Sequence, residues 1–312
     1  MTHVATGDSA RVIAITGATG FVGSTLVDLA VARGHHVRAL TRRPQPDRPG
    51  LTWIAGALDR RDALAELVDG ADAVIHVAGA VNARDRAGFA AANIAGTEAV
   101  AAAAREAGIA RFVHVSSLSA REPGISDYGW SKAGAETAVM AGGLDWIIVR
   151  PPAIYGPRDT EMLEMFRLAA RGLALLPPGG RLSVIHVGDL AELLLALATA
   201  GRDYCGRIYE PDDGRPNGWS HRGFARALGK AVGRSVATLA MPAWALRLAA
   251  RGDRLVRRGR AKLTLDRAAY FCHPDWVARA DRRPPADLWR ARIDTQRGLG
   301  DTAKWYRAQG WL

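Results

Sequence analysis

The first two hundred residues alternate short, β-branched apolar runs with longer segments in which apolar side chains recur every three or four positions. A period of two is typical of strands, and a period near 3.6 is typical of helices. The pattern predicts strands at 11–16, 36–41, 52–55, 73–77, 111–116 and 146–150, and helices at 20–33, 60–69, 87–107 and 128–141. This alternation favours an α/β fold in which helices cover both faces of a doubly wound parallel sheet.

Glycine is concentrated in the turn from the first expected strand into the first expected helix. Three glycines at this spacing allow a tight turn, close approach of a pyrophosphate to the backbone, and close packing of helix and strand. The free N–H groups and positive dipole of the helix N-terminus also favour phosphate. We therefore predict a Rossmann-type dinucleotide site, whose residues in this turn are Gly17, Thr19, Gly20, Phe21, Val22 and Gly23.

The end of the second strand distinguishes the two nicotinamide dinucleotides. An acidic residue there binds the ribose 2′-hydroxyl, whereas an arginine accommodates a 2′-phosphate. This chain has Arg42 and Arg43 directly after Thr41, and no acid. A guanidinium can bind the phosphate with two hydrogen bonds, while a carboxylate would repel it. We predict NADP(H) rather than NAD(H), with a solvated arginine pair as the alternative.

A tyrosine and a lysine stand four positions apart at the start of the expected helix 128–141. Tyr128 and Lys132 therefore share one helix face. A nearby ammonium is expected to lower the pKa of the phenol, so that Tyr128 exchanges a proton with a carbonyl or alcohol oxygen. A serine at the end of the preceding strand would orient that oxygen. Ser117 is the preferred serine, and Ser116 and Ser119 are alternatives.

The strand and helix rhythm ends near residue 150, where prolines become frequent. A further helix is expected at Asp189–Ala200, with Asp189 as its N-cap. The final third looks irregular, is rich in arginine and holds six of the nine tryptophans. We predict a dinucleotide-binding domain at 1–155, completed by about 183–200, and a smaller substrate-binding C-terminal region at 156–182 and 201–312.

Several motifs together resemble one family. The chain is similar to the extended short-chain dehydrogenases/reductases of the NAD(P)-dependent epimerase/dehydratase superfamily. The resemblance covers nearly the whole chain and is carried by the segments Thr16–Gly23, His76–Gly79, Asn93–Thr97, Val115–Ser117, Tyr128–Lys132, Arg150–Pro157, Ile185–Leu190 and Trp305–Leu312. It implies an oxidoreductase in which Lys132 also holds the nicotinamide ribose. The residues that it implies are catalytic are Ser117, Tyr128 and Lys132, with Asn93 supporting the geometry.

The same resemblance implies further cofactor contacts and some departures. Ala78 and Gly79 would line the cofactor cleft, and Pro151 would lie near the nicotinamide. Relatives commonly have Gly-Asp-Leu after the third strand, whereas this chain has Ala57 before Leu58, which removes one adenine contact and leaves Leu58 as the expected contact. Nucleotide-sugar enzymes of the family often carry an Asn and an Arg where this chain has Ala153 and Leu182, with Arg181 one position away. A nucleotide-sugar substrate is therefore disfavoured.

The composition of the chain indicates the cellular compartment in which the protein works. The chain is 48% hydrophobic and 23% charged, as expected of a globular protein with a sizeable core. Cys205 and Cys272 are the only cysteines, which indicates a reducing compartment. The first ten residues have no apolar signal core, and the longest apolar stretch, 190–200, is too short to span a bilayer. We expect a cytoplasmic enzyme. The histidines have no metal-like grouping, so no metal is expected.

The net charge of +11 is concentrated in one segment. Between 247 and 262 seven basic residues stand against one acidic residue, a local charge of +6. Arg247, Arg251, Arg254 and Arg258 share a helical stripe beside Trp244, Leu248, Leu255 and Leu263, and Met241 and Leu265 extend the apolar line. The segment 241–265 is therefore expected to lie peripherally on an anionic membrane at its inner face. A solvated helix is the alternative; nucleic acid is not expected, because no recognition motif accompanies the stripe.

Together these features predict an NADPH-dependent reductase of a ketone on a lipid-like substrate. Some bacterial proteins similar to the NADPH-binding accessory subunit of complex I reduce the 3-keto group of ceramide-type sphingolipids, and a ceramide reductase of that kind is the sharpest form of the hypothesis. Two alternatives stay open. One is a nucleotide-sugar epimerase or dehydratase, and the other is a non-catalytic NADPH-binding subunit of a membrane complex. The oligomeric state stays open too.

Overall fold

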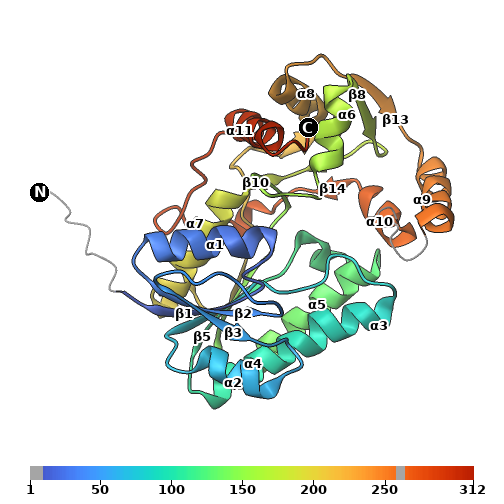
Figure 1. Ribbon diagram of the computed structural model, residues 1–312. Coiled ribbons are helices and arrows are strands. Elements are labelled where there is room, and N and C mark those ends of the chain that lie inside the picture. The colour runs from blue at the N-terminus through green and yellow to red at the C-terminus, as the bar shows by residue number, and fades with distance from the viewer. Residues whose placement is uncertain (1–9, 258–263) are drawn as a thin grey trace, which may run out of the picture.

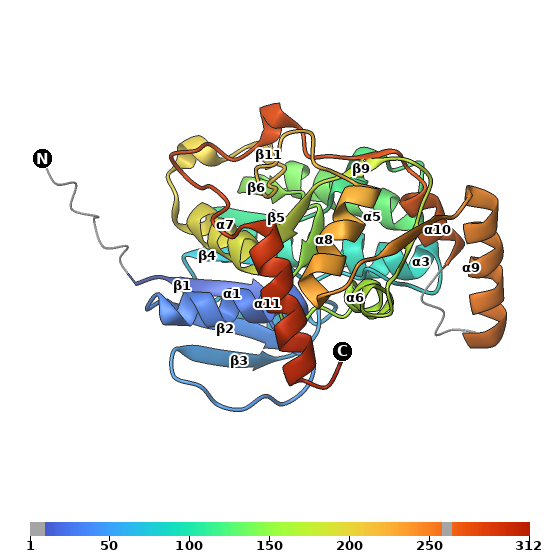
Figure 2. The same ribbon diagram turned by 90° about the horizontal axis from the view of Figure 1, so that it is seen from above.

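The computed structural model describes residues 10–257 and 264–312 of the chain. Its main sheet has seven parallel strands in the order β11-β6-β5-β4-β1-β2-β3 (Figure 1), and all seven are labelled in Figure 2. The strands are β1 (Val12–Thr16), β2 (His36–Thr41), β3 (Leu51–Ala55), β4 (Ala73–His76), β5 (Arg111–Val115), β6 (Asp145–Val149) and β11 (Arg207–Tyr209). This arrangement confirms the predicted doubly wound α/β fold.

Strand β11 corrects the predicted division of the chain. It pairs with β6 at the edge of the main sheet, although the sequence placed residues 201–312 in the smaller region. With three residues it is too short to show a period of two, so its pairing comes from the neighbouring strand rather than from its own pattern.

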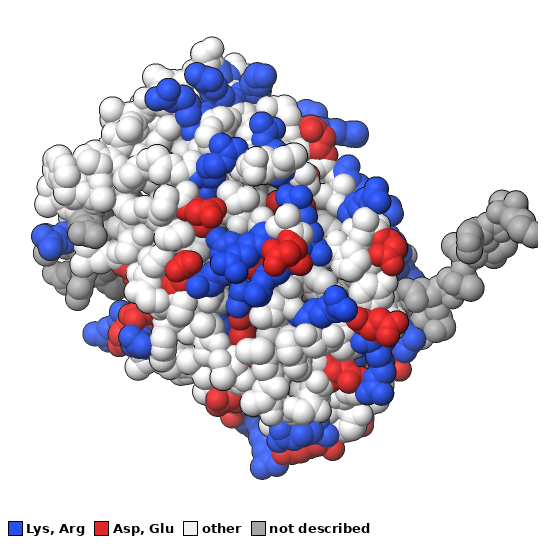
Figure 3. Space-filling model, turned by 180° about the vertical axis from the view of Figure 1, so that it is seen from behind, with Lys and Arg blue, Asp and Glu red and all other residues white. Residues whose placement is uncertain are grey.

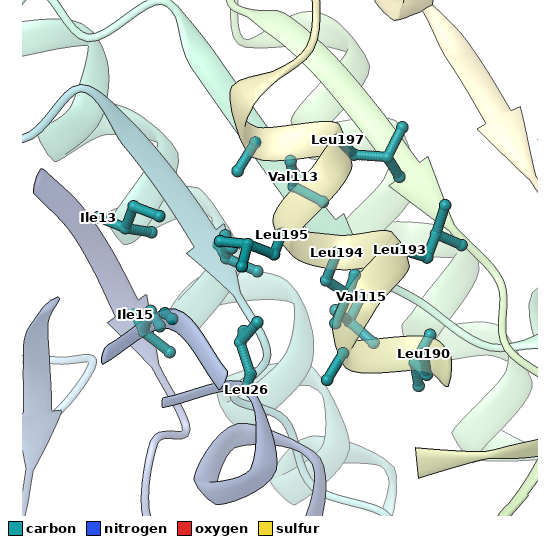
Figure 4. Packing of buried hydrophobic residues seen from close by; sticks show 14 of the residues in the cluster. Ile13, Ile15, Leu26, Val113, Val115, Leu190, Leu193, Leu194, Leu195 and Leu197 are labelled. Carbon is teal, nitrogen blue, oxygen red and sulfur yellow. The ribbon is translucent and has the colours of Figure 1, made fainter. Parts of the chain in front are cut away.

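Helices cover both faces of the sheet, as the alternation along β1 requires. Ile13 and Ile15 belong to a core formed with α1 (Phe21–Ala32) and α7 (Val187–Thr199), as Figure 4 shows. Ala14 points to the opposite core. The helices on that second face are α2 (Arg61–Val68), α4 (Gly96–Glu106) and α5 (Asp127–Ala141).

The single helix expected at 87–107 is three consecutive helical pieces. These are α3 (Arg86–Phe89), a π-helical turn η1 (Ala90–Ala95) and α4. A π turn shifts the side chains that follow it around the axis, and such turns are frequent at functional sites. Here the turn contains the buried Asn93.

The smaller region contains more regular structure than the sequence indicated. Its core packs Tyr155, Phe166 and Tyr306, all fully buried, between helices α6 (Leu163–Ala170), α8 (His221–Val232) and α11 (Thr295–Ala308). Figures 1 and 2 show α11, α8 and α6 gathered together, above the main sheet in the view of Figure 1. The short strands are β7 (Ala153–Tyr155), β8 (Leu173–Leu176), β9 (Arg181–Leu182), β10 (Val184–His186), β12 (Trp219–Ser220), β13 (Ala237–Ala240) and β14 (Asp275–Trp276). The 3-10 turns are η2 (Leu118–Arg121), η3 (Arg202–Tyr204) and η5 (Ala280–Arg282).

The predicted N-cap of α7 is wrong. His186 caps the helix, because its Nδ1 accepts a hydrogen bond of 3.0 Å from the backbone of Gly188. Asp189 lies inside the first turn, and its carboxylate accepts hydrogen bonds from the backbone nitrogens of Arg292 and Ile293. The Asp189 carboxylate thus binds the distant C-terminal segment instead of capping the helix. The local sequence does not reveal this contact.

The basic segment 241–265 contains α9 (Ala243–Arg257) and ends at the first residue of α10 (Leu265–Phe271), and both helices lie at the edge of the molecule (Figures 1 and 2). Met241 precedes α9 and Leu265 begins α10, so neither extends the apolar line of α9 as expected. Of the predicted stripes, Arg258 and Leu263 lie outside the described residues, as do the side chains of 247 and 254–257. Among the described helices none is long and apolar enough to cross a membrane.

Candidate active site

The glycine-rich turn joins β1 to α1 at the point where the strand order reverses, between β1 and β4. Such a switch point, at the carboxyl ends of the strands, is where open α/β sheets bind ligands. A Cβ on Gly17 (φ +71°) would lie 2.7 Å from the nitrogen of Ala78, and one on Gly23 would lie 2.1 Å from the oxygen of Gly17. Glycine is therefore required at both positions for steric reasons.

The N-terminus of α1 presents free donors. Gly20 occupies the N-cap position without a side-chain cap, the first turn has no acid, and Thr19 and Gly20 are exposed. Phe21 and Val22, which open the helix, are half-buried. Free N–H groups with an uncompensated helix dipole are suited to a pyrophosphate, so the residues present fit the expected cofactor.

A buried polar chain connects β1 to β4 below this turn. The Thr16 hydroxyl lies 2.7 Å from Nδ1 of His76 and accepts a hydrogen bond of 3.2 Å from the nitrogen of Ala78. His76 Nε2 lies 3.0 Å from the hydroxyl of Thr97. Burial, followed by the charge of Lys132, lowers the pKa of His76 to about 3, so the imidazole is neutral. These contacts fix Ala78 and Gly79 at the cleft edge.

Asn93 holds the loop after β4 against α5. Its side chain accepts from the nitrogen of Ala80 at 2.7 Å and donates to the oxygen of Ala80 and to the hydroxyl of Ser131. A Cβ on Gly79 would lie 3.0 Å from Asn93 Oδ1 and 3.7 Å from Lys132 Nζ. The π-helical turn thus directs an amide into the gap between the cofactor loop and the helix of Tyr128.

Lys132 lies one helical turn after Tyr128 on α5 and is buried. Its Nζ donates a hydrogen bond of 2.7 Å to the carbonyl oxygen of Val115, at the end of β5. Burial lowers the pKa of Lys132 to about 8, and the carboxylate of Glu136 opposes that shift. The ammonium is therefore retained at neutral pH and directed at the strand end that precedes the two serines.

The side chains of Tyr128 and Ser117 lie close enough for Ser117 to lower the pKa of the phenol. Burial raises the pKa of the half-buried Tyr128 by more than the nearby Ser117 lowers it. The expected lowering of the tyrosine pKa by Lys132 is therefore wrong for this structure. Burial also lowers the pKa of Lys132, and its ammonium donates its hydrogen bond to the oxygen of Val115 rather than to Tyr128.

Ser116 belongs to a different network. Its hydroxyl donates to Glu136, and Arg150 binds both carboxylate oxygens of Glu136, at 2.8 and 2.6 Å. Arg150 also lies 3.6 Å from Glu210. The Ser116 hydroxyl is engaged in a hydrogen bond to this buried cluster. Of the two serines, Ser117 is therefore the one that lies near Tyr128. The third candidate, Ser119, is buried and has no side-chain partner among the described residues.

The remaining expected cofactor residues surround the same edge of the sheet. Arg42 and Arg43 follow β2 and are exposed. Leu58 packs near Gly96 of α4, since a Cβ there would lie 2.8 Å from the leucine side chain. Pro151 is buried, and its oxygen accepts a hydrogen bond of 3.1 Å from the nitrogen of Leu118.

Sequence reasoning missed the side chains that surround Tyr128 from outside the α5 motif. Phe89 packs against its ring, with centroids 6.0 Å apart. From α10, Asp266 accepts a hydrogen bond from the nitrogen of Asp127 at the start of α5, and the charge of Arg267 lowers the pKa of the Tyr128 phenol. Tyr270, also on α10, is close enough for Tyr128 to raise its pKa further, after burial. Thr264 before Leu-Asp-Arg is a local signal for a helix start, but it does not identify what the helix contacts.

Known proteins are similar to this chain over most of its length. Residues 13–210 match the NAD dependent epimerase/dehydratase family. The chain is 38% identical over 324 residues to the ceramide reductase of Caulobacter vibrioides, covering 98% of this chain and 97% of that protein. It is 34% identical over 229 residues to the 4-hydroxy-2-methyl-3-oxo-4-farnesyl-3,4-dihydroquinoline-1-oxide ketoreductase of Stigmatella aurantiaca, covering 65% and 68%.

The fold recurs among solved structures. MoeE5 in complex with UDP-glucose and NAD aligns with a TM-score of 0.73 at 23% identity, covering 96% of this chain and 99% of that chain. At this identity the likeness concerns the fold alone. The family match and the full-length relative together show that the chain belongs to the NAD-dependent epimerase/dehydratase family and is an NAD(P)-dependent oxidoreductase.

Proposed function

We propose that this protein is an NADPH-dependent reductase of a ketone on a hydrophobic, lipid-like substrate, and most specifically of the 3-keto group of a ceramide. The observation that carries the proposal is that the Tyr128 and Ser117 side chains approach each other, with the buried Lys132 one helical turn after Tyr128 on α5. These three residues lie beside the glycine-rich switch point, and they offer a proton donor, an orienting hydroxyl and a cation for carbonyl reduction.

Each residue has a distinct role in the proposed reaction. The bound dinucleotide supplies the hydride. Tyr128 donates its proton to the carbonyl oxygen, and Ser117 donates a hydrogen bond that orients that oxygen and stabilises its developing charge. The Lys132 ammonium would hold the nicotinamide ribose. Because burial raises the pKa of Tyr128, the phenol carries its proton at neutral pH, as a proton donor requires.

The basic end of β2 supports NADPH. Arg42 and Arg43 are exposed where the 2′-substituent of the adenosine ribose is expected, and neither makes an ion pair with a described residue. A free guanidinium can bind a phosphate with two hydrogen bonds. The nearby Arg48, by contrast, is paired with Asp28.

The surroundings of Tyr128 support an apolar substrate. Phe89 packs on one side, and Tyr270 stacks on Trp276, with ring centroids 4.6 Å apart, on the side of α10. Aromatic walls exclude water and favour alkyl or other apolar groups. Both curated relatives described above bear the names of reductases of hydrophobic ketones or of lipids.

Features that would hold a nucleotide diphosphate are missing. Ala153 on β7 and Leu182 on β9 carry no donor side chain. Arg181, one position away, donates to the backbone oxygens of Asn217 and Gly218, which commits it to a structural role. These contacts disfavour a nucleotide-sugar substrate.

We further propose that α9 touches an anionic membrane. Trp244 and Leu248, one turn apart, are 69% and 60% exposed, and Arg251 beside them is exposed too. Exposed Trp and Leu next to basic residues suit the interface of an anionic bilayer. On the face in Figure 3, basic and acidic side chains lie side by side across the middle, while several basic side chains gather at the top without acids, so exposed apolar residues rather than charge make α9 the candidate contact.

Replacing the phenol tests the central proposal. Tyr128→Phe should lower the rate of NADPH-dependent ketone reduction by about 10²–10⁴-fold, because the proton donor is lost. NADPH binding, followed by fluorescence, should change little. Tyr204→Phe is the matched control, since its hydroxyl donates to Asp287 away from the site. Turnover that survives Tyr128→Phe would refute the proposal.

A further inference from the structure

The helix that carries Tyr128 begins on a carboxylate from a distant part of the chain. Asp266, in the first turn of α10, lies with Oδ1 2.5 Å from the backbone nitrogen of Asp127, 139 positions earlier. The backbone N–H of Tyr128 lies close enough to lower the pKa of the same carboxyl. Asp127 and Tyr128 are the first two residues of α5.

This contact completes the start of α5. The first N–H groups of a helix have no partner within it. The local N-cap, Ser126, accepts only from Gly129, at 2.9 Å, so the donor of Asp127 depends on Asp266. A carboxylate at this place is also favoured by the helix dipole.

The position of Asp266 is itself fixed. Thr264 caps α10 by accepting from the nitrogen of Arg267 at 3.1 Å, and Arg267 forms an ion pair with Glu161. At the far end of α10, the indole nitrogen of Trp276 donates to the oxygen of Tyr270 at 2.9 Å. The carboxylate therefore projects from a helix held at both ends.

The segment after α10 is attached to the serine side of the site. Arg121, which ends η2 four positions after Ser117, donates to the backbone oxygens of Val277 and Asp275 at 2.6 and 2.8 Å. The elements that carry Ser117 and Tyr128 thus each contact residues 264–277. The relative placement of the two hydroxyls is consequently held by the smaller region as well as by the main sheet.

We infer that Asp266 is a positioning residue, which fixes the start of α5 so that the Tyr128 hydroxyl meets Ser117 and the substrate carbonyl. The inference rests on the proposed function of Tyr128 and adds a residue to it. A hydroxyl at the end of a long side chain moves when the backbone at its root turns, and displacement by about 1 Å can reduce a rate up to ~100-fold.

Two substitutions at Asp266 and one control separate positioning from general stability. Asp266→Ala should lower kcat for ketone reduction by about 10- to 100-fold with little change in the KM for NADPH. Asp266→Asn keeps an acceptor oxygen and should recover most of that loss. Asp294→Ala removes the cap of α11, which accepts from the nitrogen of Arg297, and should lower Tm to a similar extent while leaving kcat unchanged.

A double variant tests whether Asp266 acts through Tyr128. If it does, Asp266→Ala added to Tyr128→Phe should cause no further loss of kcat, whereas a separate role in binding substrate would add its full effect. Equal losses in both backgrounds would overturn the inference.

Amide hydrogen exchange gives a readout that does not depend on the reaction. Asp266→Ala should accelerate exchange at Asp127 and Tyr128 and leave the middle of α5 unchanged. Unchanged exchange at both amides, or a kcat equal to that of the unmodified protein, would refute the positioning role. Full activity of Tyr128→Phe would instead refute the proposed function, and the exchange result would still stand.

Discussion

The hydroxyl of Ser116 donates a hydrogen bond of 2.5 Å to the carboxylate of Glu136. Its neighbour Ser117 is turned the other way, toward Tyr128. Adjacent residues in an extended backbone point to opposite sides, so the pair separates a structural hydroxyl from one that faces the reacting group. The sequence alone left open which of the two serines acts in the reaction. Their different partners make the choice testable by substitution.

Ser117→Ala should lower kcat by about 10²–10³-fold, because a hydrogen-bond donor to the developing oxyanion is lost. Ser116→Ala should instead lower the free energy of unfolding, since Glu136 loses a buried donor, and should change kcat only slightly. Steady-state kinetics and urea denaturation of both variants distinguish the two effects. The reverse pattern would assign the reacting hydroxyl to Ser116.

Two stacked histidines should make the protein sensitive to acid. Burial lowers the pKa of His76 to about 3 and that of His114 well below its ordinary value. Below about pH 6.5 the unfolded chain binds protons that the folded chain does not. The free energy of unfolding therefore decreases as the pH is lowered, by up to ~1.4 kcal/mol per pH unit for each histidine. Neither ring nitrogen of His114 has a partner among the described residues.

The variant His114→Phe should therefore lose less stability than the parent between pH 7 and pH 5. Denaturant unfolding at several pH values measures the slope. His36→Phe, at an exposed position, is the control. An unchanged slope in His114→Phe would show that the imidazole becomes protonated in the folded protein.

Arg42 and Arg43 should set the cofactor preference. Replacing either by Ala should weaken NADPH binding by about 10- to 100-fold, the loss of a charged hydrogen bond, and leave NADH binding nearly constant. Arg33→Ala, whose guanidinium is paired with Glu192, should affect neither cofactor. Titration of both dinucleotides tests this, and tighter binding of NADH by the unmodified protein would contradict it.

The exposed face of α9 should govern membrane binding. The double variant Trp244→Ser/Leu248→Ser should lower binding to vesicles of phosphatidylglycerol and phosphatidylcholine by about tenfold or more, since burial of each side chain contributes ~1.5–3 kcal/mol. Arg251→Glu should weaken binding to these anionic vesicles but not to vesicles of phosphatidylcholine alone. Met140→Ser, at another exposed apolar position, is the control. Flotation that is indifferent to these changes would exclude α9 as the contact.

The local motifs predicted the core of the site because each depends on a short stretch of chain. The glycine turn, the strands before it and after it, and the Tyr128–Lys132 spacing all follow from periodicity or from steric demands within one loop. By contrast, the three-residue β11 has too little pattern to be recognised, and the π-helical turn around Asn93 looks like ordinary helix in the sequence.

The sequence by itself determined the parallel sheet, and it predicted the place of the cofactor and the reacting pair, because these depend on apolar alternation and on residues four or fewer positions apart. Only the tertiary structure decided which serine lies near Tyr128, and that burial raises the tyrosine pKa. It alone placed Asp266 at the start of α5, 139 positions away. Burial and long-range hydrogen bonds arise when distant segments pack together, so no local pattern encodes them.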